Sequence, residues 1–295
     1  MSFTAASVQE LRKITGAGMM ECKQALVKTK GDIESAVKFL RETGHAKALK
    51  KASRVAAEGV VAIKVAKDNK SAFMVEINTE TDFAARDATF TAFVTRVINR
   101  GLEGEAVDLP ALLDLQLEIG KELTLAQDCE ALVAKIGENI KIRRVALIKN
   151  EGTIGTYCHN GRIGVLVELS PSQPDIELAK DIAMHIAASK PIVVNPEEIP
   201  AALIDSEKEI FYAQAIQTGK SKDIIEKMVV GRIQKFVNEI SLVGQPYVKD
   251  TSITVGELLK KAGAEVLSFV RFEVGEGIEK EEKDFVKDVM AQVKK

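Results

Sequence analysis

Apolar residues recur at helical spacing from the N-terminus to Gly44, and this pattern indicates three short helices. Ser7 followed by Glu10 predicts a capping box at the start of the first helix. The glycines of the TGAG sequence would end that helix, and Gly44 would end the third. We therefore expect a compact three-helix domain over residues 1–55, small enough to be an accessory domain.

The sequence AKALKKASRVAAEG, which follows the third expected helix, places four basic residues on a helical pattern. One interpretation is a contact with RNA or with an acidic protein surface. The other is a solvated linker helix, and the balanced charge of the whole chain favours it. The basic residues are Lys47, Lys50, Lys51 and Arg54.

Beyond residue 58 the apolar positions alternate, as is typical of strands. GVVAIKVAKDNKSAFMVEIN predicts a strand, a turn and a strand, and a helix with an apolar face follows it. GTIGTYCHNGRIGVLVELS predicts the same succession again, with its turn at Asn160-Gly161. Two β-hairpin-plus-helix units predict a duplicated α+β core. Its N-terminal half would span 56–150, and its C-terminal half 151–191 and 241–276.

Two helical runs lie between Ile199 and Ile240, on either side of a break at Thr218-Gly219. They predict an antiparallel helical hairpin that is inserted at 192–240 and projects from the core. Further on, AEVLSFVRFEVGEG predicts a strand, and apolar positions at helical spacing in 277–295 predict a C-terminal helix. The expected fold class is therefore α+β: a three-helix domain, a duplicated core, an inserted hairpin and a final helix.

Composition narrows the functional classes. The 295 residues are 46% hydrophobic and 28% charged, as in ordinary globular chains, and 41 Lys and Arg face 43 Asp and Glu. This balance argues against a protein that binds nucleic acid through a large net positive charge. The sequence has neither a signal core nor an apolar run long enough to cross a membrane, so we expect a cytoplasmic protein. Three cysteines without a CxxC motif indicate reduced thiols.

Catalytic signatures are weak. The GKS sequence at 219–221 ends like a phosphate-binding loop, but Gln214 occupies the position of its first glycine. Cys158 and His159 are neighbours on an expected strand, so their side chains point to opposite faces and are poorly placed as nucleophile and base. His185 lies on an apolar helix and is interpreted as a core histidine. We expect no covalent chemistry, no metal site and no cofactor.

The loop TETDFAARD, between an expected strand and an expected helix, sets an aromatic side chain beside a carboxylate. In one interpretation it caps the helix and Phe83 folds under that helix. In the other it is a rigid tip that inserts Phe83 into a pocket of a partner, as loops positioned by a scaffold often do.

The chain closely resembles the bacterial elongation factor Ts family from end to end. The resemblance rests, in order, on LRKITGAGMMECKQAL, NTETDFAARDATF, KIGENIKIRR, IAMHIAASKP and RFEVGEGIEK. It implies a ubiquitin-associated-like N-terminal domain, a two-part core, a hairpin associated with dimer formation and a C-terminal helical module. It also implies a guanine-nucleotide exchange factor, without covalent chemistry, that binds elongation factor Tu in its GDP-bound and nucleotide-free states. The factor itself would bind no nucleotide.

The resemblance also implies site residues. The tip would disturb the Mg²⁺ and phosphate site of elongation factor Tu, with Phe83 as an apolar wedge beside Asp82. Ala84 stands where the family usually carries Val, and Glu21 where Asp is common; neither departure removes a group that the mechanism needs. The tip residues are Thr81, Asp82, Phe83 and Ala84. The expected partner-binding residues are Leu11, Met19, Met20, Ile136 and His159.

Three alternatives belong to other classes. The first is an RNA-binding or ribosome-associated scaffold, which a steep salt dependence of RNA binding would favour. The second is a ubiquitin-associated-like module carried by an enzyme. The third is a hydrolase that uses Cys158 or Cys22, which insensitivity to thiol alkylation would dismiss. The sequence leaves open whether the solution species is a monomer, a homodimer or a two-plus-two complex with the partner.

Overall fold

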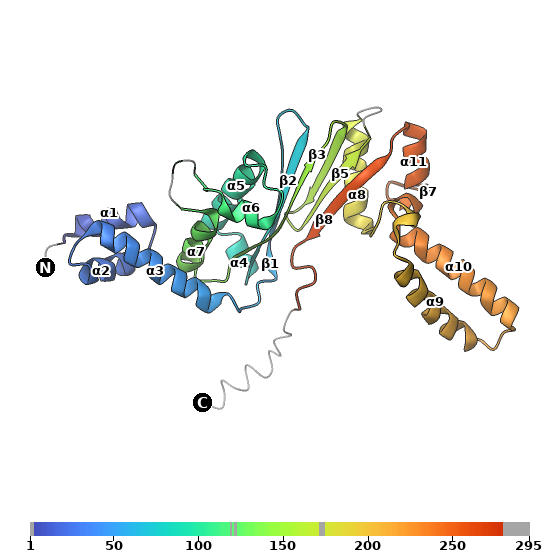
Figure 1. The fold of residues 1–295 in the computed structure, drawn as a ribbon, viewed down its shortest axis with the longest axis horizontal. Helices are drawn as coiled ribbons and strands as arrows, with labels where there is room; N and C mark the ends of the chain where they lie inside the picture. Colours follow the sequence, from blue (N-terminus) through green and yellow to red (C-terminus); the bar gives the residue numbers. More distant parts are fainter. Residues whose placement is uncertain (1–2, 119, 121–122, 171–174, 280–295) are drawn as a thin grey trace. The chain divides into compact units, whose positions relative to one another are not determined.

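The computed structural model describes residues 3–118, 120, 123–170 and 175–279. They form two compact units (Figure 1). Unit 1 takes in the described parts of residues 1–62, 75–145 and 273–295, and unit 2 takes in those of 63–74 and 146–272.

Unit 1 begins with the three expected helices. They are α1 (Ala5–Thr15), α2 (Met19–Lys28) and α3 (Ile33–Lys51). Their shared core includes Leu11, Cys22 and Leu26, which are fully buried. The predicted first cap was wrong by one turn, because Thr4 rather than Ser7 is the N-cap and Ser7 is its partner in the capping box.

The prediction that the third helix ends at Gly44 was also wrong, because α3 continues to Lys51. A Cβ atom at Gly44 would lie 3.6 Å from the Cβ of Ala134 on α7 (Leu125–Ile136). Because 3.6 Å is an ordinary van der Waals distance, α3 and α7 pack against each other here without requiring a glycine. Two of the basic residues are used within unit 1, since Lys47 pairs with Glu21 and Lys51 donates to the carbonyl of Gly137. Lys50 and Arg54 are exposed, so the basic stretch is a partly solvated helix end with two of its four basic residues paired within unit 1.

A three-stranded sheet has the order β1-β2-β3. Its strands are β1 (Glu58–Val65), β2 (Ser71–Thr79) and β3 (Lys141–Lys149). The first two are the expected hairpin, whereas sequence analysis predicted no strand at β3. Nearly every residue of β2, the central strand, is buried. After β2 come α4 (Asp82–Ala85), α5 (Ala88–Glu103), α6 (Leu109–Asp114) and α7.

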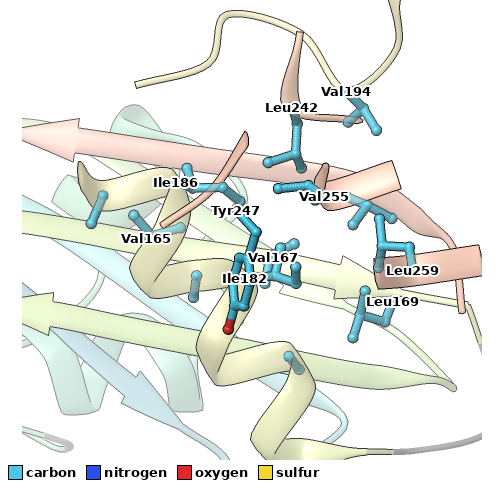
Figure 2. Packing of buried hydrophobic residues seen from close by; sticks show 14 residues of the cluster. Val165, Val167, Leu169, Ile182, Ile186, Val194, Leu242, Tyr247, Val255 and Leu259 are labelled. Carbon is cyan, nitrogen blue, oxygen red and sulfur yellow. The ribbon is translucent and has the colours of Figure 1, made fainter. Parts of the chain in front are cut away.

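Unit 2 contains a second sheet, of order β4-β5-β8. Its strands are β4 (Thr153–His159), β5 (Ile163–Leu169) and β8 (Val266–Glu273). β4 and β5 pair antiparallel from Thr153↔Leu169 to His159↔Ile163, which confirms the expected hairpin. Helix α8 (Ile176–Ser189) packs on this hairpin. Figure 2 shows their common core, in which side chains of β5, α8, Tyr247 and α11 meet.

Two long helices in unit 2 confirm the predicted helical hairpin. They are α9 (Ala201–Ile216) and α10 (Lys222–Ile240), and Ala215, Ile225 and Val229 are buried between them. Gly219 in the break has φ +67°, a conformation that glycine adopts without strain. Sequence analysis did not predict the short elements that follow, which are β6 (Pro246–Tyr247), β7 (Asp250–Thr254) and α11 (Val255–Ala262).

The structure is mixed α and β, with N-terminal helices and antiparallel pairing. Most of the expected C-terminal helix, including its apolar positions Val286, Val289, Met290 and Val293, lies outside the described residues. The five-part domain division and the duplication of the core stay predictions. In the part of the chain that the structure describes, no helix has the length and apolar character needed to cross a membrane.

Candidate functional site: an exposed aromatic turn

A single helical turn, α4, connects the central strand β2 to helix α5 in unit 1. Thr81 begins the turn as its N-cap, and its hydroxyl oxygen accepts the N–H of Ala84 over 3.2 Å. Asp87 then caps α5, accepting the N–H groups of Thr89 and Phe90. These hydrogen bonds from Thr89 and Phe90 lower the pKa of Asp87. Two consecutive caps therefore fix the backbone on both sides of α4.

Phe83 lies at the surface of this turn, with 80% of its area exposed. The interpretation in which Phe83 folds under the helix is therefore wrong. Beside it, the Asp82 carboxylate pairs with Arg86 at 2.9 Å, one helical turn away. The turn therefore presents an aromatic side chain and a carboxylate next to each other, both accessible to a partner.

Ala84, by contrast, is buried, as is Ala85. Its methyl group packs beneath the turn and is not presented at the surface. The surface of the turn is therefore made by Asp82 and Phe83, while Thr81 and Ala84 support it from below.

A carboxylate from the segment after α7 holds the turn. Oε2 of Glu138 accepts the Thr81 N–H over 3.0 Å, and its Oε1 accepts the Thr81 hydroxyl over 2.8 Å. The neighbouring Glu80 is bound in the same way, because its Oε1 accepts the N–H of Asn139 over 2.6 Å. Sequence analysis missed Glu138 and Asn139, since nothing in GEN at 137–139 shows that these residues meet a loop far away in sequence.

The residues expected to bind a partner on the N-terminal helices divide into two groups. Met19 and Met20 begin α2 and are 48% and 62% exposed. Leu11 is fully buried in the core of the three helices. Leu11 therefore cannot make a direct surface contact in this structure. Its side chain instead packs in the core of the three helices that carry Met19 and Met20.

Ile136 and His159 lie in different units. Ile136 ends α7 and is partly buried. His159 ends β4 in unit 2, is exposed, and has its Nδ1 3.1 Å from the hydroxyl of Tyr157. Since Tyr157 and His159 are two residues apart on a strand, they share one face, and the adjacent Cys158 points to the other. The structure thus brings Thr81 to Ala84 together, and Ile136 lies two residues before Glu138, which binds Thr81. The other predicted residues lie on α1, α2 and β4.

His185 and Cys129 are buried and belong to the packed core. His185 is fully buried, with Nε2 2.9 Å from Oε1 of Gln245 and with Nδ1 accepting the N–H of Val248. It is the satisfied core histidine that the sequence predicted. Burial raises the pKa of Cys129 to about 12, so its thiol stays protonated at neutral pH. Among the described residues, no group of three or more His, Cys, Asp and Glu could hold a metal ion.

Comparison with known proteins gives a consistent result. The family model for "Elongation factor TS" matches residues 80–276. The chain is 54% identical over 293 residues to elongation factor Ts of Legionella pneumophila (strain Paris), covering 99% of each chain. It is 54% identical over 295 residues to that of Saccharophagus degradans, covering 99% of this chain and 98% of the relative. It is 50% identical over 292 residues to that of Coxiella burnetii (strain Dugway 5J108-111), covering 99% and 98%.

Proposed function

This chain belongs to the elongation factor Ts family, and from that premise we propose that it is a guanine-nucleotide exchange factor for elongation factor Tu. It binds elongation factor Tu with GDP, speeds the release of GDP and leaves the emptied site to GTP. The observation that carries this proposal on the structural side is the 80% exposure of Phe83 on a turn that is capped at both ends.

The turn acts on the partner's nucleotide site by displacement. Mg²⁺ requires near-ideal octahedral geometry, and phosphates are cradled by fixed backbone N–H groups, so a small shift of either weakens nucleotide binding strongly. Phe83 is the wedge and Asp82 the charged group that enters beside the ion. Because Ala84 is buried, it sets the height of the turn instead of entering the partner.

The other contacts provide affinity. The exposed Met19 and Met20 are flexible apolar side chains that adapt to a partner surface, and they dock the N-terminal helices on elongation factor Tu. Ile136 contributes from the end of α7. His159, at the β4–β5 turn, contacts the phosphate-binding side of the partner as a surface residue and not as an acid or base.

No acid, base or nucleophile is needed for this function. If the factor weakens GDP binding by a certain ratio, GDP weakens binding of the factor by the same ratio. The factor therefore accelerates exchange without shifting the final nucleotide equilibrium. The protein acts in the cytoplasm, where translation takes place, and the α9–α10 hairpin is its candidate dimer contact.

The RNA-scaffold alternative is disfavoured by two contacts. Lys47 pairs with Glu21 and Lys51 binds the end of α7, so the basic stretch is partly occupied within unit 1. The hydrolase alternative is disfavoured because His159 has the Tyr157 hydroxyl at 3.1 Å, on the strand face opposite to Cys158.

The test is release of a fluorescent GDP analogue from elongation factor Tu, with and without this protein. We expect a strong acceleration by the wild type. Asp82→Ala and Phe83→Ala should lower the maximal rate while the variants still bind. Since the chain has no Trp, a tryptophan signal on mixing would report on the partner alone.

Two results would contradict the proposal in different ways. Acceleration that Asp82→Ala and Phe83→Ala leave intact would keep the exchange function and reject the turn as its site. No acceleration by the wild type at any concentration would reject the exchange function and leave a binding scaffold.

A further inference from the structure

We propose that Glu138 is a positioning residue for the exposed turn, fixing the location of Phe83 and Asp82 through its two hydrogen bonds to Thr81. The inference rests on the proposed exchange function and adds to it a residue 57 positions from Thr81 in sequence. Glu138 acts through Thr81 and not on the partner.

The hydrogen bonds of Thr81 form a closed set. Its N–H and its hydroxyl proton are donated to the two carboxylate oxygens of Glu138, over 3.0 and 2.8 Å. Its carbonyl accepts the hydroxyl of Thr79 over 2.7 Å. Because the hydroxyl proton is directed to Glu138, a lone pair of the same oxygen is left for the N–H of Ala84. Glu138 therefore orients the cap that starts α4.

The exposed residues of the turn do not supply this anchor. Phe83 extends into solvent, and the Asp82 carboxylate pairs with Arg86 close by in sequence. The methyl groups of Ala84 and Ala85 do pack beneath the turn, but apolar contact is non-directional and fixes depth more than orientation. Hydrogen bonds are directional, so the two bonds from Thr81 to Glu138 set the angle at which Phe83 is presented.

Glu138 is itself held by the backbone on both sides. Before it, Gly137 ends α7 in the left-handed conformation, with φ +92°, and its carbonyl accepts the ammonium group of Lys51. After it, the N–H of Asn139 donates to Glu80 and its side-chain amide donates to the carbonyl of Arg54 over 2.7 Å. The ends of α3 and α7 thus form a rigid support from which the carboxylate reaches the turn.

The experiment compares the wild type with Glu138→Ala and Glu138→Gln in the release of a fluorescent GDP analogue at graded factor concentrations. We expect Glu138→Ala to lower the maximal rate about ten-fold or more, because small misplacements of a working group are costly. Glu138→Gln, which keeps one acceptor, should fall between the two. The half-saturating concentration should stay within about two-fold, since the docking surface is unchanged. The matched control is Glu103→Ala, which removes an exposed carboxylate on α5 that pairs with Arg100.

A combined variant tests whether Glu138 acts through Asp82 and Phe83. If it does, adding Glu138→Ala to a variant that already carries Asp82→Ala and Phe83→Ala should slow exchange no further, because the groups that Glu138 positions are already gone. Fold-losses that multiply would overturn the inference. A drop in maximal rate accompanied by an equal rise in half-saturation, or by a less cooperative urea unfolding transition, would also overturn it by showing a general structural role.

Amide hydrogen exchange of residues 79–87 tests, in the absence of the partner, whether Glu138 restrains the turn. We expect faster exchange in Glu138→Ala than in the wild type and in Glu103→Ala. Unchanged protection would overturn the inference that Glu138 restrains the turn, whatever the exchange kinetics show. An active wild type with an equally active Glu138→Ala would overturn the positioning role alone, whereas an inactive wild type would reject the proposed function itself.

Discussion

The backbone N–H of Gly275 donates to Oε1 of Glu76 over 2.9 Å, joining two residues 199 positions apart. Glu76 is fully buried in β2, and Arg143 and Arg144 approach its carboxylate at 3.1 and 2.5 Å. Burial alone would raise the pKa of Glu76, but the hydrogen bonds from Gly275, Asn78 and Arg144 hold that pKa below its ordinary value. The charged carboxylate thus fastens the segment after β8 to the central strand of unit 1.

Replacing this carboxylate should destabilise the fold. In Glu76→Gln, Arg143 and Arg144 lose the Glu76 carboxylate, although Arg144 still pairs with Glu276 at 3.2 Å. Breaking a buried ion pair of this kind costs about 3 kcal/mol in free energy of unfolding. Urea unfolding monitored by circular dichroism measures the loss. The control is Glu151→Gln, whose solvent-exposed pair with Lys70 should contribute much less to stability. Equal effects of the two substitutions would show that the buried network adds no stability.

The same network should respond to pH. Because the folded-state pKa of Glu76 lies below the ordinary value of 4.5, its contribution to stability is fully present above pH 4.5. It is lost as the pH falls through the folded-state value. The difference in unfolding free energy between wild type and Glu76→Gln should therefore shrink in unfolding series taken below pH 4.5. A difference that stays constant to pH 3 would mean that Glu76 contributes no charge.

His185 should give the protein a second pH dependence, at a higher pH. Burial lowers the pKa of His185 below 6.5, and its hydrogen bond with Gln245 only partly offsets this. The unfolded chain therefore takes up the proton first, and the folded state loses stability as the pH falls from 7.5 to 5.5. Urea unfolding at these two pH values measures the loss.

In His185→Gln the pH-dependent loss should be smaller, whereas His45→Gln, at an exposed pair with Glu130, should retain it. An NMR titration provides an independent check, since the His185 ring should keep its neutral shifts below pH 6.5. A His185 signal with its midpoint at or above pH 6.5 would contradict the prediction.

Local chemistry in the sequence determined much of this fold. The helices of the N-terminal domain, both β-hairpins and the break at Gly219 follow from spacing, turn residues and caps within a few positions of each other. The end of the third helix was misplaced at Gly44 because α3 continues past it to pack against α7, which lies far along the chain. Strand β3 was missed for a related reason. Its KIRR sequence carries charges that look solvent-exposed, but Arg143 and Arg144 pair with the buried Glu76 in unit 1.

The candidate site was predictable in part. The sequence marked TETDFAARD as unusual, and the exposure of Phe83 agrees with the second of the two interpretations. It could not reveal Glu138, because the hydrogen bonds to Thr81 depend on where α7 ends relative to β2. Nor could it separate Leu11 from Met20, since an apolar side chain on a small amphipathic helix can face the core or a partner.

The three thiols should differ sharply in reactivity. Cys22 and Cys129 are buried, whereas Cys158 is exposed on β4. Since the thiolate is the reactive form, the pKa of about 12 for Cys129 makes it inert at neutral pH. Titration with a chromogenic disulfide should show one fast thiol in the native protein and three after denaturation. Cys158→Ser should abolish the fast phase, and two fast thiols in the native wild type would contradict the burial of one of them.

Substitutions of Leu11 and Met20 should have different effects, the first on the stability of the N-terminal helices and the second on the affinity for the partner. Leu11 has no exposed surface, so Leu11→Ala removes core volume and should cost about 2–5 kcal/mol in the stability of the three N-terminal helices. Met20 is 62% exposed, so Met20→Ala should leave that stability within about 0.5 kcal/mol. If Met20 docks on elongation factor Tu, its truncation removes apolar area that is buried only in the complex, and it raises the half-saturating concentration without lowering the maximal rate.

The discriminating measurement is a pair of titrations at low temperature, where the three N-terminal helices of Leu11→Ala remain folded by circular dichroism. Under that condition Leu11→Ala should bind elongation factor Tu much as the wild type does, because its side chain supports the surface without forming it. Met20→Ala should still bind more weakly. If folded Leu11→Ala binds as weakly as Met20→Ala, the N-terminal helices must rearrange on binding and expose Leu11 to the partner. The core that buries Leu11 would then exist only in the free protein.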